Sequence, residues 1–281
     1  MSPRGRRPVA IRPRAAIVLT LVSLGGLIMF LWPLFVVPPA GGTAHAGDAP
    51  FLFALILPLL IATVLAELGD DGFDVKAIAI IGVLAGVGAV LRPLGAGTAG
   101  IETVFFLLII GGRAFGAGFG FVLGSTTLFA SALLTGGVGP WLPFQMMAAS
   151  WIGLGAGLLP RLRGRRELVM LVVYGVVAAY AFGFLMNIWF WPYAAGTFVG
   201  GGDPGLQFVP GDAVIENLRR FVLFTFATST VGWDTGRAIT TAVAITTVGG
   251  PVLAAVRRTR RRAAFVEETR DTSTGFEVVT R

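Results

Sequence analysis

The chain has 281 residues, of which 55% are hydrophobic and 13% are charged, and its formal net charge is +7. Average soluble domains carry about 25% charged residues, so this composition excludes an ordinary soluble protein and predicts an all-α integral membrane protein. Cysteine is absent, which excludes disulfides, thiolate metal sites and covalent haem attachment. The arginines lie in short blocks at helix ends, so positive-inside anchoring explains the net charge better than nucleic-acid binding.

Apolar stretches of about 20 residues predict a polytopic bundle of about eight transmembrane helices. The fourth span is short and depends on tight pairing with the fifth through a turn at residues 111–113. The last segment is too long for one simple span, so we expect its first half to lie near the outer surface or to line a cavity and 238–256 to complete the crossing. The predicted spans are 15–37, 51–68, 76–92, 101–113, 114–135, 143–159, 167–192 and one within 218–256.

Arginine distribution predicts the orientation in the membrane. Three segments carry blocks of arginine, namely 1–14, 160–166 and 257–262. Three loops contain no Lys or Arg, namely 38–50, 136–142 and 193–217. We therefore expect a multi-pass protein of the cell membrane with a basic cytoplasmic N-terminus (1–14), a cytoplasmic C-terminus and these three loops outside. Residues 263–281 are polar and rich in Thr and Glu, which predicts a disordered cytoplasmic tail.

Polar residues gather at the predicted outer ends of the spans. Such residues within a bilayer are functional candidates by default, and an unpaired amide in hydrocarbon is costly, so Gln145 must face a neighbouring helix or a cavity. Aromatic walls with a few directed polar groups are typical of a small-molecule pocket. The candidate substrate-binding residues are Arg92, Glu102, Trp141, Gln145, Asn187, Trp191, Trp233, Asp234 and Arg237.

Several of these candidates have a second interpretation. Asp234 and Arg237 are spaced i,i+3 and can form a purely structural ion pair on one helix face. Trp191 and Trp233 are interpreted either as pocket walls or as interfacial belt residues. For Asn187, contact with a ligand or loop is favoured over a hydrogen bond between helices.

Four stretches in the second part of the chain carry a family resemblance. They read AIAIIGVLAGVGAVLRPLGAGTAGIETVFF, GRAFGAGFGFVLGSTTLFASALLTGGVGPWLPFQMMAASWIGLGAGL, LMNIWFWP and STVGWDTGRAI with a PVLAAVRR ending. In this order they resemble the substrate-binding S component of energy-coupling factor (ECF) vitamin transporters. The resemblance implies a six-helix core over 71–262, no cofactor, a transmembrane coupling (T) subunit and two cytoplasmic ATPase subunits as partners. It leaves 15–70 as two additional transmembrane helices.

Small residues one turn apart mark the predicted span 76–92. Gly82-x-x-x-Gly86 and Ala85-x-x-x-Ala89 allow close approach of another helix. In S components, small residues on this helix form the contact with the coupling subunit, so the resemblance implies a partner interface at these four positions. Packing inside this protein is the alternative, because glycine totals 40 and small pairs recur in other spans.

Two nucleotide-binding motifs bear on the chemistry, one that the sequence matches only in letters and one that it lacks. GAGTAG at 95–100 matches the dinucleotide fingerprint in letters, but it joins two membrane helices rather than a strand and a helix, so we interpret it as a flexible lid or rim. The chain has no G-x-x-x-x-G-K-[ST] motif, and Lys76 is its only lysine, so it cannot energise transport with its own P-loop.

The leading hypothesis is therefore a non-catalytic subunit that binds a vitamin outside and passes it to a partner complex. The long loop 193–217 and the aromatic residues favour a large ligand, with cobalamin or a related corrinoid preferred. Riboflavin, thiamine, biotin and folate precursors remain open. The alternative hypothesis is an intramembrane lipid-modifying enzyme that uses Glu102 or Asp234 as its acid or base.

Overall fold

The computed structural model describes residues 13–34, 59, 62–63, 66, 75–95, 100–193, 205–209 and 211–273. Within these ranges all regular structure is helical. The main elements are α1 (Pro13–Phe30), α3 (Val75–Leu91), α4 (Val104–Phe115), α5 (Ala117–Thr135), α6 (Leu142–Leu158), α7 (Arg165–Phe190), α8 (Val214–Thr225), the π-helical segment η4 (Phe226–Asp234) and α9 (Thr235–Ser273). Short 3₁₀ turns are η1 (Trp32–Leu34), η2 (Arg92–Leu94) and η3 (Trp191–Tyr193).

The protein is a polytopic helical membrane protein, as its composition predicts. Five stretches among the described residues are long and apolar enough to cross a membrane: Pro13–Phe30, Lys76–Leu94, Ala117–Thr135, Arg165–Phe190 and Val214–Thr259. The predicted span 51–68 and the predicted outer loop 38–50 lie outside the described residues, apart from positions 59, 62, 63 and 66 of that span.

The predicted turn between the fourth and fifth spans is misplaced by a few residues. Gly111 and Gly112 lie within α4, and the chain turns instead at Gly116, where φ is 113°. This backbone conformation is accessible to glycine and strained for other residues. The glycine pair of α4 has a packing role, because a Cβ at Gly112 would collide with the backbone carbonyl of Gly153 on α6.

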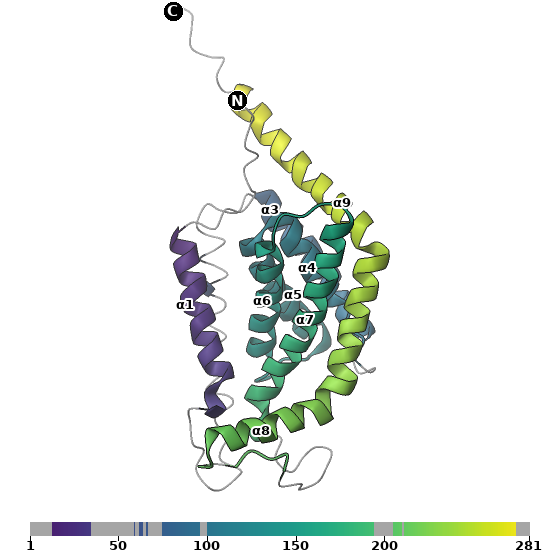
Figure 1. Ribbon diagram of the computed structural model, residues 1–281. Helices are drawn as coiled ribbons and strands as arrows, with labels where there is room; N and C mark the ends of the chain where they lie inside the picture. The colour runs from purple at the N-terminus through teal and green to yellow at the C-terminus, as the bar shows by residue number, and fades with distance from the viewer. Residues whose placement is uncertain are drawn as a thin grey trace, which may run out of the picture.

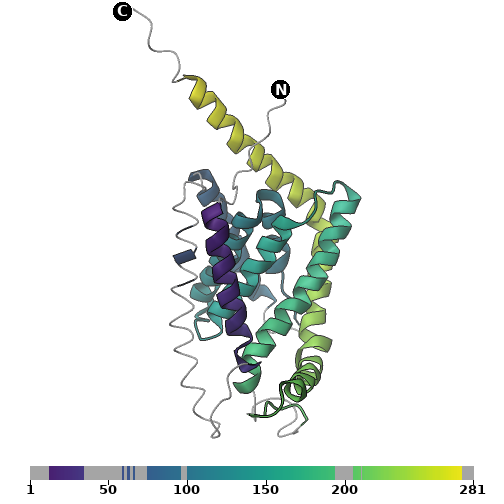
Figure 2. The same cartoon turned by 60° about the vertical axis from the view of Figure 1, so that its left-hand side comes forward.

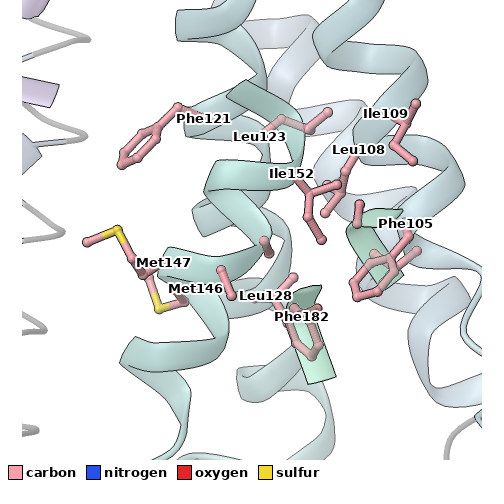
Figure 3. Packing of buried hydrophobic residues seen from close by; sticks show 14 of the residues in the cluster. Phe105, Leu108, Ile109, Phe121, Leu123, Leu128, Met146, Met147, Ile152 and Phe182 are labelled. Atoms are coloured by element: carbon pink, nitrogen blue, oxygen red, sulfur yellow. The ribbon is translucent and has the colours of Figure 1, made fainter. Parts of the chain in front are cut away.

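Contacts between glycine backbones bring α4, α5 and α6 together. A Cβ at Gly120 on α5 would also collide with the Gly153 carbonyl, and one at Gly124 would collide with the carbonyl of Ala149. Small residues allow this approach, which membrane helices use because lipid supplies no hydrophobic drive for their association. The apolar core lies among these helices and α7 (Figure 3), where the Phe105 and Phe182 rings pack edge to face with centroids 4.9 Å apart.

The end of the chain lies partly across the bundle and partly along it. Figure 1 shows α8 lying across the lower end of the bundle, and η4 turns the chain upward into α9. This arrangement agrees with the interpretation of 218–256 as a surface half followed by a crossing half. Phe221 and Phe224 of α8 are buried, whereas Ile215 and Val222 are exposed.

The helix α9 is longer than expected. It continues to Ser273, so the tail predicted to be disordered from residue 263 is helical over 263–273, and 274–281 lie outside the described residues. Arg, Ala and Glu are good helix formers. In this segment their helix propensity decides the structure, although the polar composition predicted disorder. Pro251 lies inside α9, directly after Gly249 and Gly250. Figure 2 shows the last part of α9 extending beyond the other helices.

A buried ion cluster closes the arginine-rich end, which is opposite α8 in Figure 1. The Glu167 carboxylate on α7 accepts bonds from Arg113 Nε of α4 at 2.6 Å and from Arg257 of α9 at 2.6 and 3.0 Å. Only 4% of the Glu167 side chain and 6% of that of Arg113 are exposed. Arg113 also donates to the carbonyl of Leu159 at 2.9 Å, so the cluster joins three helices and the α6–α7 loop.

Candidate functional site

Arg237 on the first turn of α9 is the centre of a charged cluster at the α8 end. Its Nε donates to Glu102, and its Nη1 donates to Asp234 at 2.8 Å. The guanidinium also lies over the rings of Phe105 and Phe182, 5.4 and 4.9 Å from their centroids. Arg237 is buried, and its charge is compensated by two carboxylates and two aromatic faces.

Asp234 ends the π-helical segment and is only 1% exposed. Its Oδ2 accepts a hydrogen bond from Ser229 at 3.0 Å, and its carboxylate packs against Gly183 of α7, where a Cβ would collide with both oxygens. The wider turn of a π-helix brings residues i and i+5 together, which places Ser229 beside Asp234. Gly183 therefore makes room for the buried acid.

Arg92 in the turn after α3 forms the second part of the site. Its Nη2 donates to Gln145 Oε1 on α6 at 3.0 Å, and its Nη1 donates to Ser131 Oγ on α5 at 3.4 Å. Its Nε is buried without a hydrogen-bond partner. Arg92 also lies within electrostatic range of Glu102 and Arg237, so the two parts form one polar site.

Asn187 lies on α7, one turn beyond Gly183. Its Nδ2 is buried and has no hydrogen-bond partner, and its backbone carbonyl accepts the N–H of Trp191 at the helix end. A buried donor left unsatisfied costs about 1–3 kcal/mol. Among the described residues this donor does not form the hydrogen bond between helices that was the less favoured alternative, and contact with a ligand stays a prediction.

The three candidate tryptophans occupy different environments. Trp191 is 1% exposed, donates to the carbonyl of Leu206 at 2.8 Å and packs against Phe208 and Phe221, so its interpretation as an interfacial belt residue is wrong. Trp141 and Trp233 are each 43% exposed at the same end of the bundle.

The loop at 95–100 meets the site through its last glycine. Gly100 has φ 76°, and a Cβ there would collide with the backbone carbonyl of Trp233. The end of this loop therefore packs directly on the π-helical segment. Residues 96–99, the middle of the predicted lid, lie outside the described residues.

The structure thus brings Arg92, Glu102, Gln145, Asp234 and Arg237 together. Sequence reasoning missed Ser131, Ser229, Gly183 and the two phenylalanines beside Arg237. The i,i+5 spacing of Ser229 and Asp234 has no signal in an α-helical pattern, and Gly183 resembles any other small residue of a membrane helix.

Comparison with known protein families agrees with this geometry. Residues 76–256 match the family model described as "ECF transporter, substrate-specific component". The chain belongs to this family. Neither the curated proteins nor the solved structures that were compared contain a match. As an S component, the protein is a transporter subunit that takes a small-molecule substrate and works with T and ATPase subunits.

The matched region excludes α1, which lies before residue 76. This helix packs against α6 and α7 of the S component, and Trp151 Nε1 of α6 donates to Ser23 Oγ of α1 at 3.0 Å. Between α1, α6 and α7 lies an open apolar groove of about 550 Å³. This groove is separate from the charged site, and none of the candidate binding residues lines it.

The four predicted partner-interface residues separate into two pairs. Ala85 and Ala89 are 2% and 4% exposed and face the inside of the S component, so their assignment to an outward interface is wrong. A Cβ at Gly82 or Gly86 would meet nothing within 4 Å. A helix turns 100° per residue, which puts the alanines on the inner face of α3 and the glycines on the open face.

Both acids of the alternative enzyme hypothesis are already engaged. Glu102 and Asp234 both form ion pairs with Arg237, so neither carboxylate stands unpaired as an acid or base for a substrate. The geometry therefore gives this hypothesis no support.

Proposed function

We propose that this S component binds a vitamin or related micronutrient at the α8 end, on the outer side of the cell membrane, and delivers it through a T subunit driven by two cytoplasmic ATPases. The observation that carries the proposal is the partly buried polar cluster of Arg92, Glu102, Gln145, Asp234 and Arg237, which gathers at one end of the bundle. Membrane proteins retain such groups where they bind substrates or ions.

Two features of the protein favour ligand binding over a purely structural network. The Arg92 Nε and the Asn187 Nδ2 are buried donors without partners, and a folded protein leaves few such groups unsatisfied. A bound ligand supplies the missing acceptors. The aromatic side chains of Trp141 and Trp233 lie exposed at the same end, where they can contact an entering molecule.

The arginine distribution supports the orientation. Within the described residues, six exposed arginines lie at the end opposite the site: Arg14, Arg161, Arg163, Arg165, Arg166 and Arg258. Cytoplasmic loops are enriched in arginine, so this end faces the cytoplasm and the polar site faces outward. Reporter fusions after residues 141 and 202 should be external, and a fusion at residue 281 should be internal.

The open face of α3 is the proposed contact with the T subunit. Gly82 and Gly86 are exposed, and Val83 and Val87 beside them are 67% and 46% exposed. Small residues on a lipid-facing surface allow another helix to approach closely. Because Ala85 and Ala89 face inward, the proposed interface contains only the glycine pair of the original four residues.

The experiment is co-expression with the T and ATPase subunits, purification in detergent, and mass spectrometry of the retained small molecules. Cobalamin remains the preferred large ligand, and it should be tested by calorimetry beside riboflavin, thiamine and biotin. The Asn187→Leu variant should weaken binding of the retained compound by about 10- to 100-fold, since one buried hydrogen bond is lost.

The matched control is Thr246→Leu, because Thr246 is exposed on α9 and bonds only within its own helix. This variant should bind as the unaltered protein does. A protein that neither retains nor binds a small molecule, or that transforms a lipid on its own, contradicts the proposed function.

A further inference from the structure

Arg92 differs from Arg113, Arg237 and Arg257 in what compensates its charge. Arg113 and Arg257 pair with Glu167, and Arg237 pairs with Glu102 and Asp234. Among the described residues, no carboxylate lies within the 4.0 Å ion-pair distance of Arg92. Its two hydrogen-bond acceptors, Gln145 and Ser131, are both neutral.

The neighbouring charges do not substitute for a counter-ion. Glu102 attracts Arg92, but Arg237 repels it, and the Glu102 carboxylate is itself paired with Arg237. The attraction by Glu102 is the larger of the two effects, but it acts on Arg92 without an ion-pair contact. A partly buried cation without a direct anion is costly in free energy, and among the described residues Arg92 has no such anion.

The orientation of Arg92 is nevertheless fixed. Gln145 Oε1 holds Nη2 at 3.0 Å and Ser131 Oγ holds Nη1 at 3.4 Å, which leaves the buried Nε–H as the donor without a partner. Arginine presents several N–H donors in one plane and pairs with carboxylates and phosphates in that plane. Gln145 is in this view a positioning residue for Arg92.

We infer that the ligand carries an anionic group, a carboxylate or a phosphate, which Arg92 binds directly; this inference rests on the proposed function and names its substrate class. Asn187 Nδ2, a second buried donor, suits another acceptor of the same molecule. Arg237 takes no part in recognising the anion, because two carboxylates already occupy it. We therefore expect anionic compounds to bind more tightly than neutral or cationic ones.

The test uses pairs of probes that differ in the anionic group: nicotinate and nicotinamide, pantothenate and panthenol, pyridoxal phosphate and pyridoxal, and riboflavin phosphate and riboflavin. Thermal unfolding shifts and calorimetry on the purified full-length protein give the affinity of each probe, and any compound identified by mass spectrometry is added. We expect at least one anion to bind about 10- to 100-fold more tightly than its neutral partner, as one charged contact provides. The carboxylate and phosphate pairs distinguish the two kinds of anion.

Variants then assign the preference to Arg92. Arg92→Gln should abolish the difference within the pair, and Arg92→Lys should retain part of it. Gln145→Leu should weaken binding of the anion and leave binding of its neutral partner unchanged. Arg219→Gln is the matched control, because the Arg219 side chain is 76% exposed, and it should change nothing.

Three results would overturn the inference while leaving the transporter role in place. They are a retained ligand without an anionic group, equal binding within every pair that binds, and an Arg92→Gln variant that keeps the preference for the anion. The first two results are measured on the unaltered protein. They therefore test the inference even if a variant fails to fold. A protein that binds no probe and retains no compound contradicts the proposed function, and the inference with it.

Discussion

We expect a leucine substitution to have opposite effects on the open face and on the inner face of α3. Gly86→Leu adds a side chain where a Cβ meets nothing within 4 Å, so the isolated S component should fold and bind its ligand normally. Ala85→Leu adds the same bulk to a position that is 2% exposed. Overpacking of this kind costs about 1–3 kcal/mol.

The effect on the complex follows from dispersion forces between closely packed helices. Each optimal pair of carbon atoms contributes about 0.1–0.2 kcal/mol, so a contact of roughly 20 such pairs contributes about 3 kcal/mol. A leucine at position 86 would hold the T-subunit helix about 2–3 Å farther away, and most of this energy would be lost. We expect the complex to weaken by roughly 100-fold.

Co-purification of the T subunit and thermal unfolding of the isolated protein measure the two effects separately. Gly86→Leu should lose the complex and keep the melting temperature, and Ala85→Leu should lower the melting temperature. If Gly86→Leu keeps the complex, or if Ala85→Leu loses the complex without loss of stability, the assignment of the two faces is refuted.

Three further substitutions test the packing and the ion clusters. Gly183→Ala should displace the Asp234 carboxylate and lower ligand affinity at least tenfold, measured by calorimetry. Gly153→Ala should collide with the Gly120 carbonyl and lower the free energy of unfolding by about 1–3 kcal/mol, measured by denaturation in mixed detergent. Glu167→Gln should lower that free energy by about 2–3 kcal/mol, below the 3–5 kcal/mol of a fully buried pair, because Arg257 is 33% exposed.

Matched controls exist for each of these substitutions. Gly232→Ala and Gly82→Ala place a Cβ where nothing lies within 4 Å, and both should keep binding and stability. Glu216→Gln removes a half-exposed acid whose partner is 3.9 Å away, so its effect should stay below about 1 kcal/mol. A control that is as damaging as its test variant would contradict the packing argument.

Composition and hydropathy were sufficient to predict the fold class and most helix positions, because long apolar runs have few alternatives in a bilayer. Pairwise contacts were harder to predict. The sequence indicated the Asp234–Arg237 pair through its i,i+3 spacing, but Glu102 lies far along the chain, and its contact with Arg237 depends on how α4 and α9 pack. Gln145 was predicted to need a partner, yet only the structure identifies that partner as Arg92.

Other errors have physical causes that a pattern cannot show. Small residues at positions 82–89 predicted close helix contact, but the spacing alone does not say which face turns inward. Tryptophan is a residue type that is common at membrane interfaces. Trp191 is nevertheless buried, because residues 205–209 fold back over it. In both cases the outcome depends on segments distant in the sequence.

The Gly249–Gly250–Pro251 run is the point at which α9 is expected to bend. Proline removes one backbone hydrogen bond and crowds the preceding turn, so a helix bends most easily there. Arg237 lies on one side of this point and Arg257 on the other. The pairing of Arg257 with Glu167 therefore holds the part of α9 after Pro251 against α7. If this pairing opens, we expect the part of α9 after Pro251 to bend while the part that holds Arg237 stays in place.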